Sequence, residues 1–138
     1  MGCDIHAHVE VKFRGQWVHY NAPHVRRHYD LFAKLAGVRN DGEIEPIAPP
    51  RGLPVDIADL TRAIYEAEGG AEYTHSASHI TADEMRDVAR WYDSLDHNRT
   101  QGGHHGFEGV FGYLNGNSIA SLGDGLVEDA RLVFWFDN

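Results

Sequence analysis

Residues 3–13 read Cys-Asp-Ile-His-Ala-His-Val-Glu-Val-Lys-Phe, and apolar and polar side chains alternate along the whole stretch. This period of two is typical of a β-strand with one face toward a core and the other toward polar surroundings. The apolar face carries Ile5, Ala7, Val9, Val11 and Phe13. The polar face carries Asp4, His6, His8, Glu10 and Lys12. Residues 14–16 read Arg-Gly-Gln and predict a tight turn into a second strand at 17–20, which makes an antiparallel hairpin.

The other end of the chain predicts a further strand. Residues 130–136 read Ala-Arg-Leu-Val-Phe-Trp-Phe, a run that is rich in β-branched and aromatic residues and too apolar for an exposed edge. We therefore expect a central strand that lies beside the first one. Polar residues near the ends of this strand could supply carboxylates, although their default interpretation is a solvated turn; they are Asp124, Asp129 and the pair Asp137 and Asn138.

Three helices are expected between these strands. Asp30 is placed to cap a short helix, and Asp56 is placed to cap a second helix that runs to about Glu68. Thr81 and Glu84 form a capping box directly before an apolar stripe at helical spacing, which predicts the third helix.

A glycine-rich segment separates the third helix from the last strand. Residues 97–125 carry eight of the fifteen glycines, which predicts a small hairpin and a long flap. Strands at both ends with helices between them indicate a single α+β domain over residues 1–138. We expect a small, mainly antiparallel sheet with about three helices packed on one face and the Gly-rich flap beside it.

Composition excludes several classes of function. The chain has 138 residues, of which 42% are hydrophobic, and this suits one compact core. A net charge of −9 opposes broad nucleic-acid binding, because Lys and Arg supply that affinity. No apolar run approaches the roughly 20 residues that span a bilayer, and no signal peptide is expected. The single cysteine, Cys3, excludes an internal disulfide, so we expect a cytoplasmic protein and leave a homo-oligomer open.

The polar face of the first strand is a candidate metal site. Asp4, His6 and His8 share this face, and alternate side chains on a strand lie about 7 Å apart. A carboxylate with imidazoles suits a divalent ion such as zinc or manganese. Histidines in other segments could complete the ligand set, namely His75, His79 and the pair His104 and His105, and the set that we select is Asp4, His6 and His75. The alternative is a solvated polar strand face.

Residues 75–79 read His-Ser-Ala-Ser-His directly before the third helix, where hydroxyls and first-turn amides could face an anion. The plain alternative is that Ser78 or Thr81 caps the helix. Ser76 or Cys3 with a histidine base is a candidate nucleophile, although neither lies in a recognisable nucleophile elbow or cysteine-protease signature.

Arginines in irregular connections are candidate ligands for phosphate or carboxylate, because a guanidinium binds such groups in a bidentate way. Ion pairs with some of the 21 acidic residues are the commoner fate of a surface arginine. The candidate ligand-binding residues are Arg39, Asn40, Arg51 and Ser78.

Five blocks of the sequence resemble a family of uncharacterised bacteriophage proteins. They read Met-Gly-Cys-Asp-Ile-His at 1–6, Tyr-Asp-Leu-Phe-Ala-Lys-Leu-Ala-Gly-Val-Arg-Asn at 29–40, Pro-Arg-Gly-Leu-Pro at 50–54, His-Ser-Ala-Ser-His-Ile-Thr at 75–81 and Arg-Leu-Val-Phe-Trp-Phe-Asp-Asn at 131–138. The resemblance spans nearly the whole chain and implies a phage source, without an established activity, cofactor or catalytic residue. Members tend to differ at the positions of His8 and His28, which implies that these two are weaker site candidates than Asp4, His6 and His75.

These observations lead to three functional hypotheses. The first is a phage-encoded, metal-assisted hydrolase for a small phosphorylated or nucleotide-like substrate, with His6, His75 and Ser76 as catalytic residues and a metal ion that activates water. The second is a non-catalytic phage protein that binds and sequesters a nucleotide-type signalling ligand as counter-defence. The third is a host-protein interaction module in which the histidines are structural.

Overall fold

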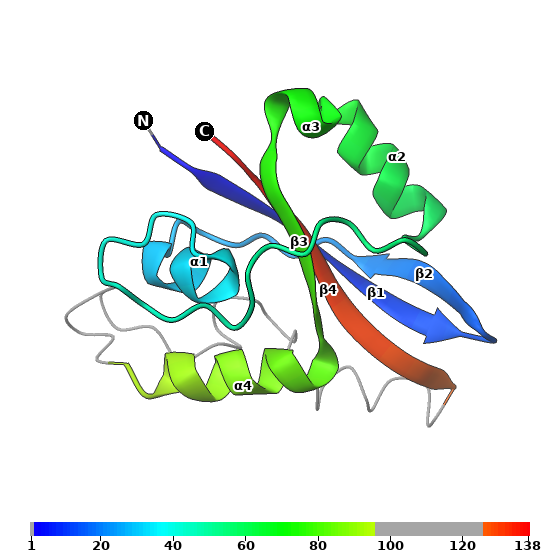
Figure 1. Ribbon diagram of the computed structural model, residues 1–138. Coiled ribbons are helices and arrows are strands. Elements are labelled where there is room, and N and C mark those ends of the chain that lie inside the picture. The colour runs from blue at the N-terminus through cyan, green and yellow to red at the C-terminus, as the bar shows by residue number, and fades with distance from the viewer. Residues whose placement is uncertain (1, 96–125) are drawn as a thin grey trace.

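The computed structural model describes residues 2–95 and 126–138. Within these residues one antiparallel sheet has the strand order β2-β1-β4-β3 (Figure 1). The strands are β1 (Asp4–Phe13), β2 (Gln16–Asn21), β3 (His75–Thr81) and β4 (Val127–Asp137). The helices are α1 (Tyr29–Ala36), α2 (Asp59–Ala67), α3 (Gly70–Tyr73) and α4 (Ala82–Asp93). The predicted α+β class with an antiparallel sheet is confirmed, whereas the predicted Gly-rich flap and its hairpin lie outside the described residues.

The hairpin and the last strand have the predicted arrangement. A two-residue turn at Arg14 and Gly15 joins β1 to β2, and both residues have positive φ, at 50° and 77°. Positive φ at both positions is the geometry that matches the twist of a hairpin. β4 runs antiparallel to β1, with Asp4 opposite Asp137. The start of β1 and the end of β4 therefore lie at the same end of the sheet, beside the two termini in Figure 1.

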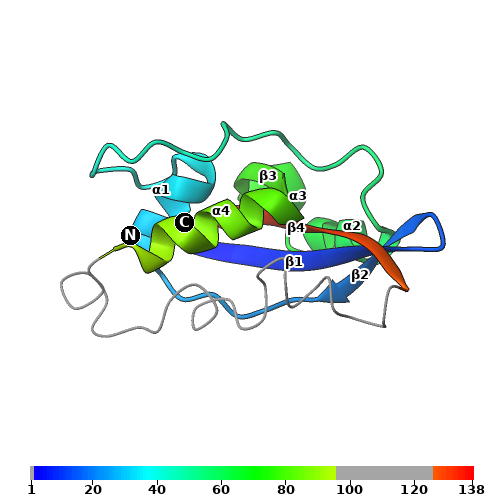
Figure 2. The same ribbon diagram turned by 90° about the horizontal axis from the view of Figure 1, so that it is seen from below.

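The first face of the sheet packs against α1 and α4. Figure 1 shows these two helices on one side of the strands, and in Figure 2, which is seen from below, α4 lies on the near side of the sheet. The core on this face joins apolar side chains of the strands to buried residues of both helices, among them Leu31, Phe32, Leu35, Met85, Val88 and Tyr92. Apolar burial of this kind is the main force that holds helices onto a sheet.

The second face of the sheet carries a smaller core under α2. It consists of Ile57, Val133 and Trp135, with Ile64 and Tyr65 packed against them. Helices therefore lie on both sides of the strands (Figure 1), and the expectation that all helices pack on one face is wrong. The reason lies in β4, because its side chains are buried on both faces and need cover on both.

Two predicted helix caps are wrong, and one strand was not predicted. Helix α1 has His28 as its N-cap residue, so Asp30 lies in the first turn instead of capping the helix. Residues 75–81 form the edge strand β3, because their backbone pairs with β4. Helix α2 begins at Asp59 after the N-cap residue Ala58, since the Asp56 carboxylate binds Arg131 instead of capping the helix. The capping box of α4 is confirmed, with both of its hydrogen bonds between Thr81 and Glu84 present.

Candidate functional site

Most of the predicted catalytic and metal-binding residues lie at one end of the sheet, where β1 and β3 begin and β4 ends. We call this region the sheet end and define it as Asp4, His6, His75, Ser76, Asp137 and Asn138. Cross-strand pairing places His6 opposite Trp135 and His75 opposite Phe136. Because β4 lies between β1 and β3, segments about 70 positions apart in the sequence meet here.

His6 is held between two carboxylates at the sheet end. Its Nε2 lies 2.7 Å from Asp137 Oδ2, and its Nδ1 lies 3.3 Å from Glu68 Oε1. Glu68 in turn accepts a hydrogen bond of 2.9 Å from Trp135 Nε1. His6 and Glu68 also line a pocket of about 230 Å³ together with His24. These contacts fix the ring orientation of His6, which is how a carboxylate partner prepares a histidine for proton transfer.

His75 lies between a hydroxyl and an amide. Its Nδ1 is 3.0 Å from Ser76 Oγ, and its Nε2 is 3.3 Å from Asn138 Oδ1. Consecutive side chains of a regular strand point to opposite faces, so this contact needs a distorted strand. The distortion is present: the β3–β4 register shifts between His75 and Ser78, and Ser76 has a φ of 55°. The result is a series of a hydroxyl, an imidazole and an amide, each within hydrogen-bond distance of the next.

The predicted metal ligands do not gather around one point. His6 stacks on Trp135 and His75 on Phe136, and these consecutive β4 residues belong to the cores on opposite faces of the sheet. Asp4 accepts two hydrogen bonds from Arg27, at 2.7 and 3.1 Å, which lower the pKa of its carboxyl below the ordinary value. Among the described residues, no group of three or more His, Cys, Asp or Glu side chains is arranged to hold a metal ion. The set Asp4, His6 and His75 therefore does not fit a shared ion.

The predicted ligand-binding residues mostly have structural partners. Arg51 binds both carboxylate oxygens of Glu84, at 2.7 and 2.6 Å, and its backbone N–H donates to Ser78 Oγ. This pairing lowers the pKa of Glu84 to about 2. Asn40 closes its own loop by two hydrogen bonds of 2.7 Å to the backbone of Ile44.

Arg39 lies close to Cys3, the residue before Asp4 of the sheet end. Its guanidinium lies 5.4 Å from the centre of the Tyr29 ring, and the Tyr29 hydroxyl accepts a hydrogen bond from the backbone N–H of Cys3. Burial raises the pKa of the Cys3 thiol, partly offset by the charge of Arg39. A buried thiol with a raised pKa is a poor nucleophile, which favours Ser76 over Cys3.

The middle of the same strand face forms a buried polar network that the alternating pattern did not indicate. Glu10 is fully buried and accepts hydrogen bonds from Arg131 Nε, at 2.8 Å, and from the backbone N–H of Ala58, at 2.9 Å. Arg131 also donates to Asp56 Oδ1 at 2.7 Å and lowers the pKa of that carboxyl. This network connects β1, β4 and the start of α2.

His8 is buried next to this network and is not a free ligand. Its Nδ1 lies 3.0 Å from His19 Nε2, and its ring stacks on Trp135 at a centroid distance of 4.7 Å. Burial lowers the pKa of His8 to about 4, and it also lowers the pKa of His19. His8 is therefore neutral at physiological pH and acts as a packing and hydrogen-bonding residue.

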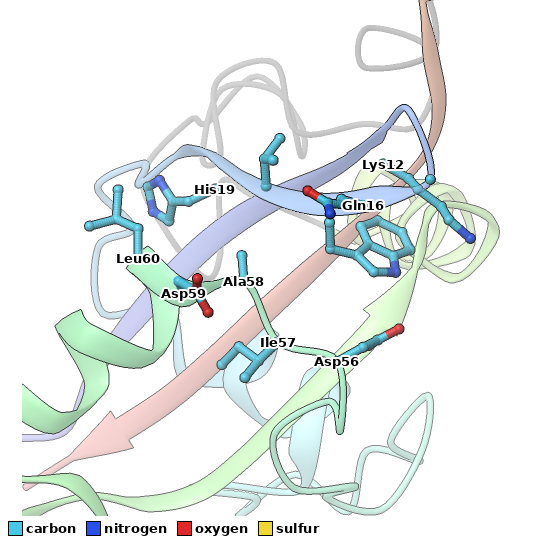
Figure 3. Close-up of a pocket in the computed structure, with 11 residues that line it drawn as sticks. Lys12, Gln16, His19, Asp56, Ile57, Ala58, Asp59 and Leu60 are labelled. Carbon is cyan, nitrogen blue, oxygen red and sulfur yellow. The ribbon is translucent and has the colours of Figure 1, made fainter.

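Sequence reasoning missed the contact of Glu68 with His6, the contact of Asn138 with His75 and a large pocket at the hairpin. Glu68 follows α2 and has no local sequence signal, while Asn138 looked like a solvated terminal residue. The pocket has a volume of about 620 Å³ and lies between the hairpin and the segment that leads into α2. In Figure 3, Lys12, Gln16 and His19 lie on one side of it, and Asp56, Ile57 and Asp59 lie on the other.

Comparisons of this chain with protein-family models, with curated proteins and with solved structures find no match. The assignment of roles therefore depends on the geometry of the molecule. Within residues 2–95 and 126–138, no helix has the length and apolar character needed to cross a membrane.

Proposed function

We propose that the chain is a phage-encoded hydrolase that acts in the host cytoplasm on a small phosphorylated or nucleotide-like ester. Ser76 is the nucleophile, His75 is its general base, and Asn138 orients the base. The proposal depends on one observation, the series of contacts from Ser76 Oγ to His75 Nδ1 at 3.0 Å and from His75 Nε2 to Asn138 Oδ1 at 3.3 Å. Such a series is the signature of an activated hydroxyl.

The backbone of Ser76 supports this role. A non-glycine residue with φ near 55° costs about 1–2 kcal/mol relative to an ordinary strand conformation. Strained backbone of this kind is concentrated at active sites, because the surrounding structure must hold a reactive group in a fixed direction. Here the strain turns the hydroxyl of Ser76 toward the ring of His75.

The chemistry proceeds in two balanced steps. Ser76 Oγ attacks the ester phosphorus as His75 Nδ1 accepts its proton, and the leaving alcohol departs with that proton. Water then attacks the phosphorus of the covalent intermediate and gives a proton to His75. His75 returns this proton to Ser76 Oγ as the P–O bond to the serine breaks, which releases the phosphate product and restores the free hydroxyl. The neutral amide of Asn138 orients the ring, as the third member of a triad does.

His6 has a positioning role in this proposal. Its contact with Asp137 at 2.7 Å ties the end of β4 to β1, and Asn138 follows Asp137 directly. The hydrogen bond thereby limits where the amide of Asn138 can lie relative to His75. His6 and His75 do not share a metal ion in this mechanism, because they lie over opposite faces of the sheet.

A covalent label tests the nucleophile directly. The protein is incubated with a fluorophosphonate, which transfers a phosphonyl group to an activated serine, and the adduct is counted by intact mass spectrometry. We expect one adduct on the unmodified chain and none on Ser76→Gly, because glycine adopts the positive φ without strain and removes only the hydroxymethyl group. His75→Gln should slow labelling by about 100-fold or more, the usual contribution of a general base.

Ser94→Ala is the matched control, because Ser94 is an exposed serine whose hydroxyl donates to the backbone oxygen of Trp91 and, among the described residues, contacts no histidine. It should label at the unmodified rate. Turnover is measured in parallel with p-nitrophenyl phosphate and bis(p-nitrophenyl) phosphate. Equal labelling of Ser76→Gly and the unmodified chain, or a folded protein without any adduct, would overturn the proposal.

A further inference from the structure

The pocket at the hairpin is lined by the ring of Trp17, and the guanidinium of Arg131 packs against this ring. The guanidinium carbon of Arg131 lies 4.0 Å from the centre of the Trp17 ring, and Trp17 lines the pocket. Arg131 is only 8% exposed and is itself fixed by Glu10 and Asp56, with contacts of 2.6 and 2.7 Å. The indole is thus a platform whose orientation is set by a buried ion-pair network.

The positive charge of Arg131 next to the Trp17 indole determines which kind of ligand ring can stack on the indole. Arg131 occupies the position that a cationic ligand would use on the π-system, and Lys12 Nζ lies 6.0 Å from the same ring centre. A third cation is disfavoured by these two charges. A neutral heteroaromatic ring stacks without that repulsion, and base–aromatic stacking tolerates any base because every base has a π-face.

Polar side chains around the platform supply both hydrogen-bond donors and acceptors. Lys12, Gln16 and Asp59 line the pocket, and the described residues offer the side chains of Gln16 and Asp59 no hydrogen-bond or ion-pair partner. An amide and a carboxylate can read the N–H and carbonyl groups on the edge of a nucleobase, and an ammonium can bind a phosphate. Asp56 and Asp59 keep the pocket from being strongly basic, so several phosphates would be repelled.

We propose that this pocket binds a nucleobase-bearing ligand, a nucleoside or nucleoside monophosphate, with its base stacked on Trp17 and its edge bound by Gln16 and Asp59. A volume of about 620 Å³ is within the range of small-molecule sites. The pocket is formed at the end of β1 that joins the hairpin, whereas Ser76 and His75 lie at the opposite end. The proposal therefore stands independently of the hydrolase.

Calorimetric titration with the four nucleosides and their 5′-monophosphates, up to about 1 mM, tests the site. We expect saturable one-to-one binding, and weaker binding of the triphosphates. Trp17→Leu should weaken binding by at least about 5-fold through loss of stacking, whereas Trp17→Phe keeps a ring and should retain most of it. Lys12→Gln should weaken the monophosphates and leave the nucleosides unchanged.

Two controls separate this site from the rest of the molecule. Trp91→Phe changes a tryptophan on α4, outside the pocket, and should bind like the unmodified chain. Ser76→Gly should also bind normally, so that failure of the hydrolase and failure of this site are distinguishable. No saturable heat with any of the eight ligands, or equal affinities of Trp17→Leu and the folded unmodified chain, would overturn the proposal.

Discussion

One face of β1 contains two regions that look alike in the sequence and differ in the structure. At the sheet end, the side chains of Asp4 and His6 are 50% and 31% exposed. In the middle of the strand, His8 is 4% exposed and Glu10 is fully buried. The alternation of polar residues is the same throughout, so the difference must come from what covers the strand.

Two features create the buried region. Ile57 and Ala58, just before α2, lie over the middle of the strand face, where the Ala58 N–H binds Glu10 directly. The neighbouring strands also offer partners there, since Arg131 is opposite Glu10 and His19 faces His8. Polar groups can be buried when their hydrogen bonds are made. The polar side chains in the middle of the strand are therefore buried in a hydrogen-bonded network, whereas those at the sheet end stay accessible to solvent.

The largest expected effect comes from breaking the buried ion pair. Glu10→Gln keeps the shape of the side chain but leaves Arg131 with a buried charge that only the half-exposed Asp56 offsets. Loss of one partner from a buried pair costs about 3–5 kcal/mol, which urea denaturation would measure as a lower free energy of unfolding. Replacing both partners, in Glu10→Leu with Arg131→Met, should recover much of this loss. If Glu10→Gln left the free energy of unfolding nearly unchanged, the middle of β1 would not contain a buried ion-pair network.

A smaller effect concerns the pH dependence of stability. His8 has a pKa of about 4 in the folded chain, against an ordinary value of 6.5. Between these values the unfolded chain binds a proton and the folded chain does not, so the free energy of unfolding rises with pH. The shift corresponds to about 3 kcal/mol, fully present above the ordinary value and lost as the pH falls toward 4.

Urea denaturation between pH 7 and pH 4, about the window between the two pKa values, checks this prediction. His8→Phe keeps a ring against Trp135 and removes the titrating group, so its stability should fall less with acid over this range. The Glu84 carboxyl, whose pKa is lowered to about 2 by Arg51, begins to lose its contribution near its ordinary value of 4.5. It does so in both proteins, so the difference between their two curves reports on His8. Parallel curves for both proteins would mean that His8 is not a buried neutral histidine.

Much of the fold was predictable from local signals. The alternation in residues 3–13, the apolar run at 130–136 and the Thr81–Glu84 capping box each specify one element without help from the rest of the chain. β3 was missed because residues 75–79 lack an apolar alternation and are a strand only through pairing with β4. α2 was placed too early because Asp56 looks like a cap in sequence, while its carboxylate has a stronger partner in Arg131.

The candidate site was predictable as a set of residues and not as a set of contacts. His6, His75 and Ser76 were selected by residue type, and the strand order places all three at the sheet end. Their partners depend on features that no local pattern encodes. A register shift in β3 turns Ser76 toward His75. His6 stacks on Trp135 and His75 stacks on Phe136, and the two β4 side chains lie on opposite faces of the sheet, so the two histidines are kept apart.

The smallest expected effect is at the exposed end of the same strand face. Asp4→Asn removes the ion pair with Arg27, whose side chain is 53% exposed. An exposed ion pair contributes little stability, because water screens the charges and the side chains lose conformational freedom when they pair. The free energy of unfolding of Asp4→Asn should therefore differ from that of the unmodified chain by no more than the error of urea denaturation. Arg27→Gln is the matched partner change and should behave alike, and added salt should remove any residual difference. Glu10 and Asp4 are both carboxylates that pair with arginine on one strand face. If Asp4→Asn cost as much as Glu10→Gln, burial would not be what separates the two regions.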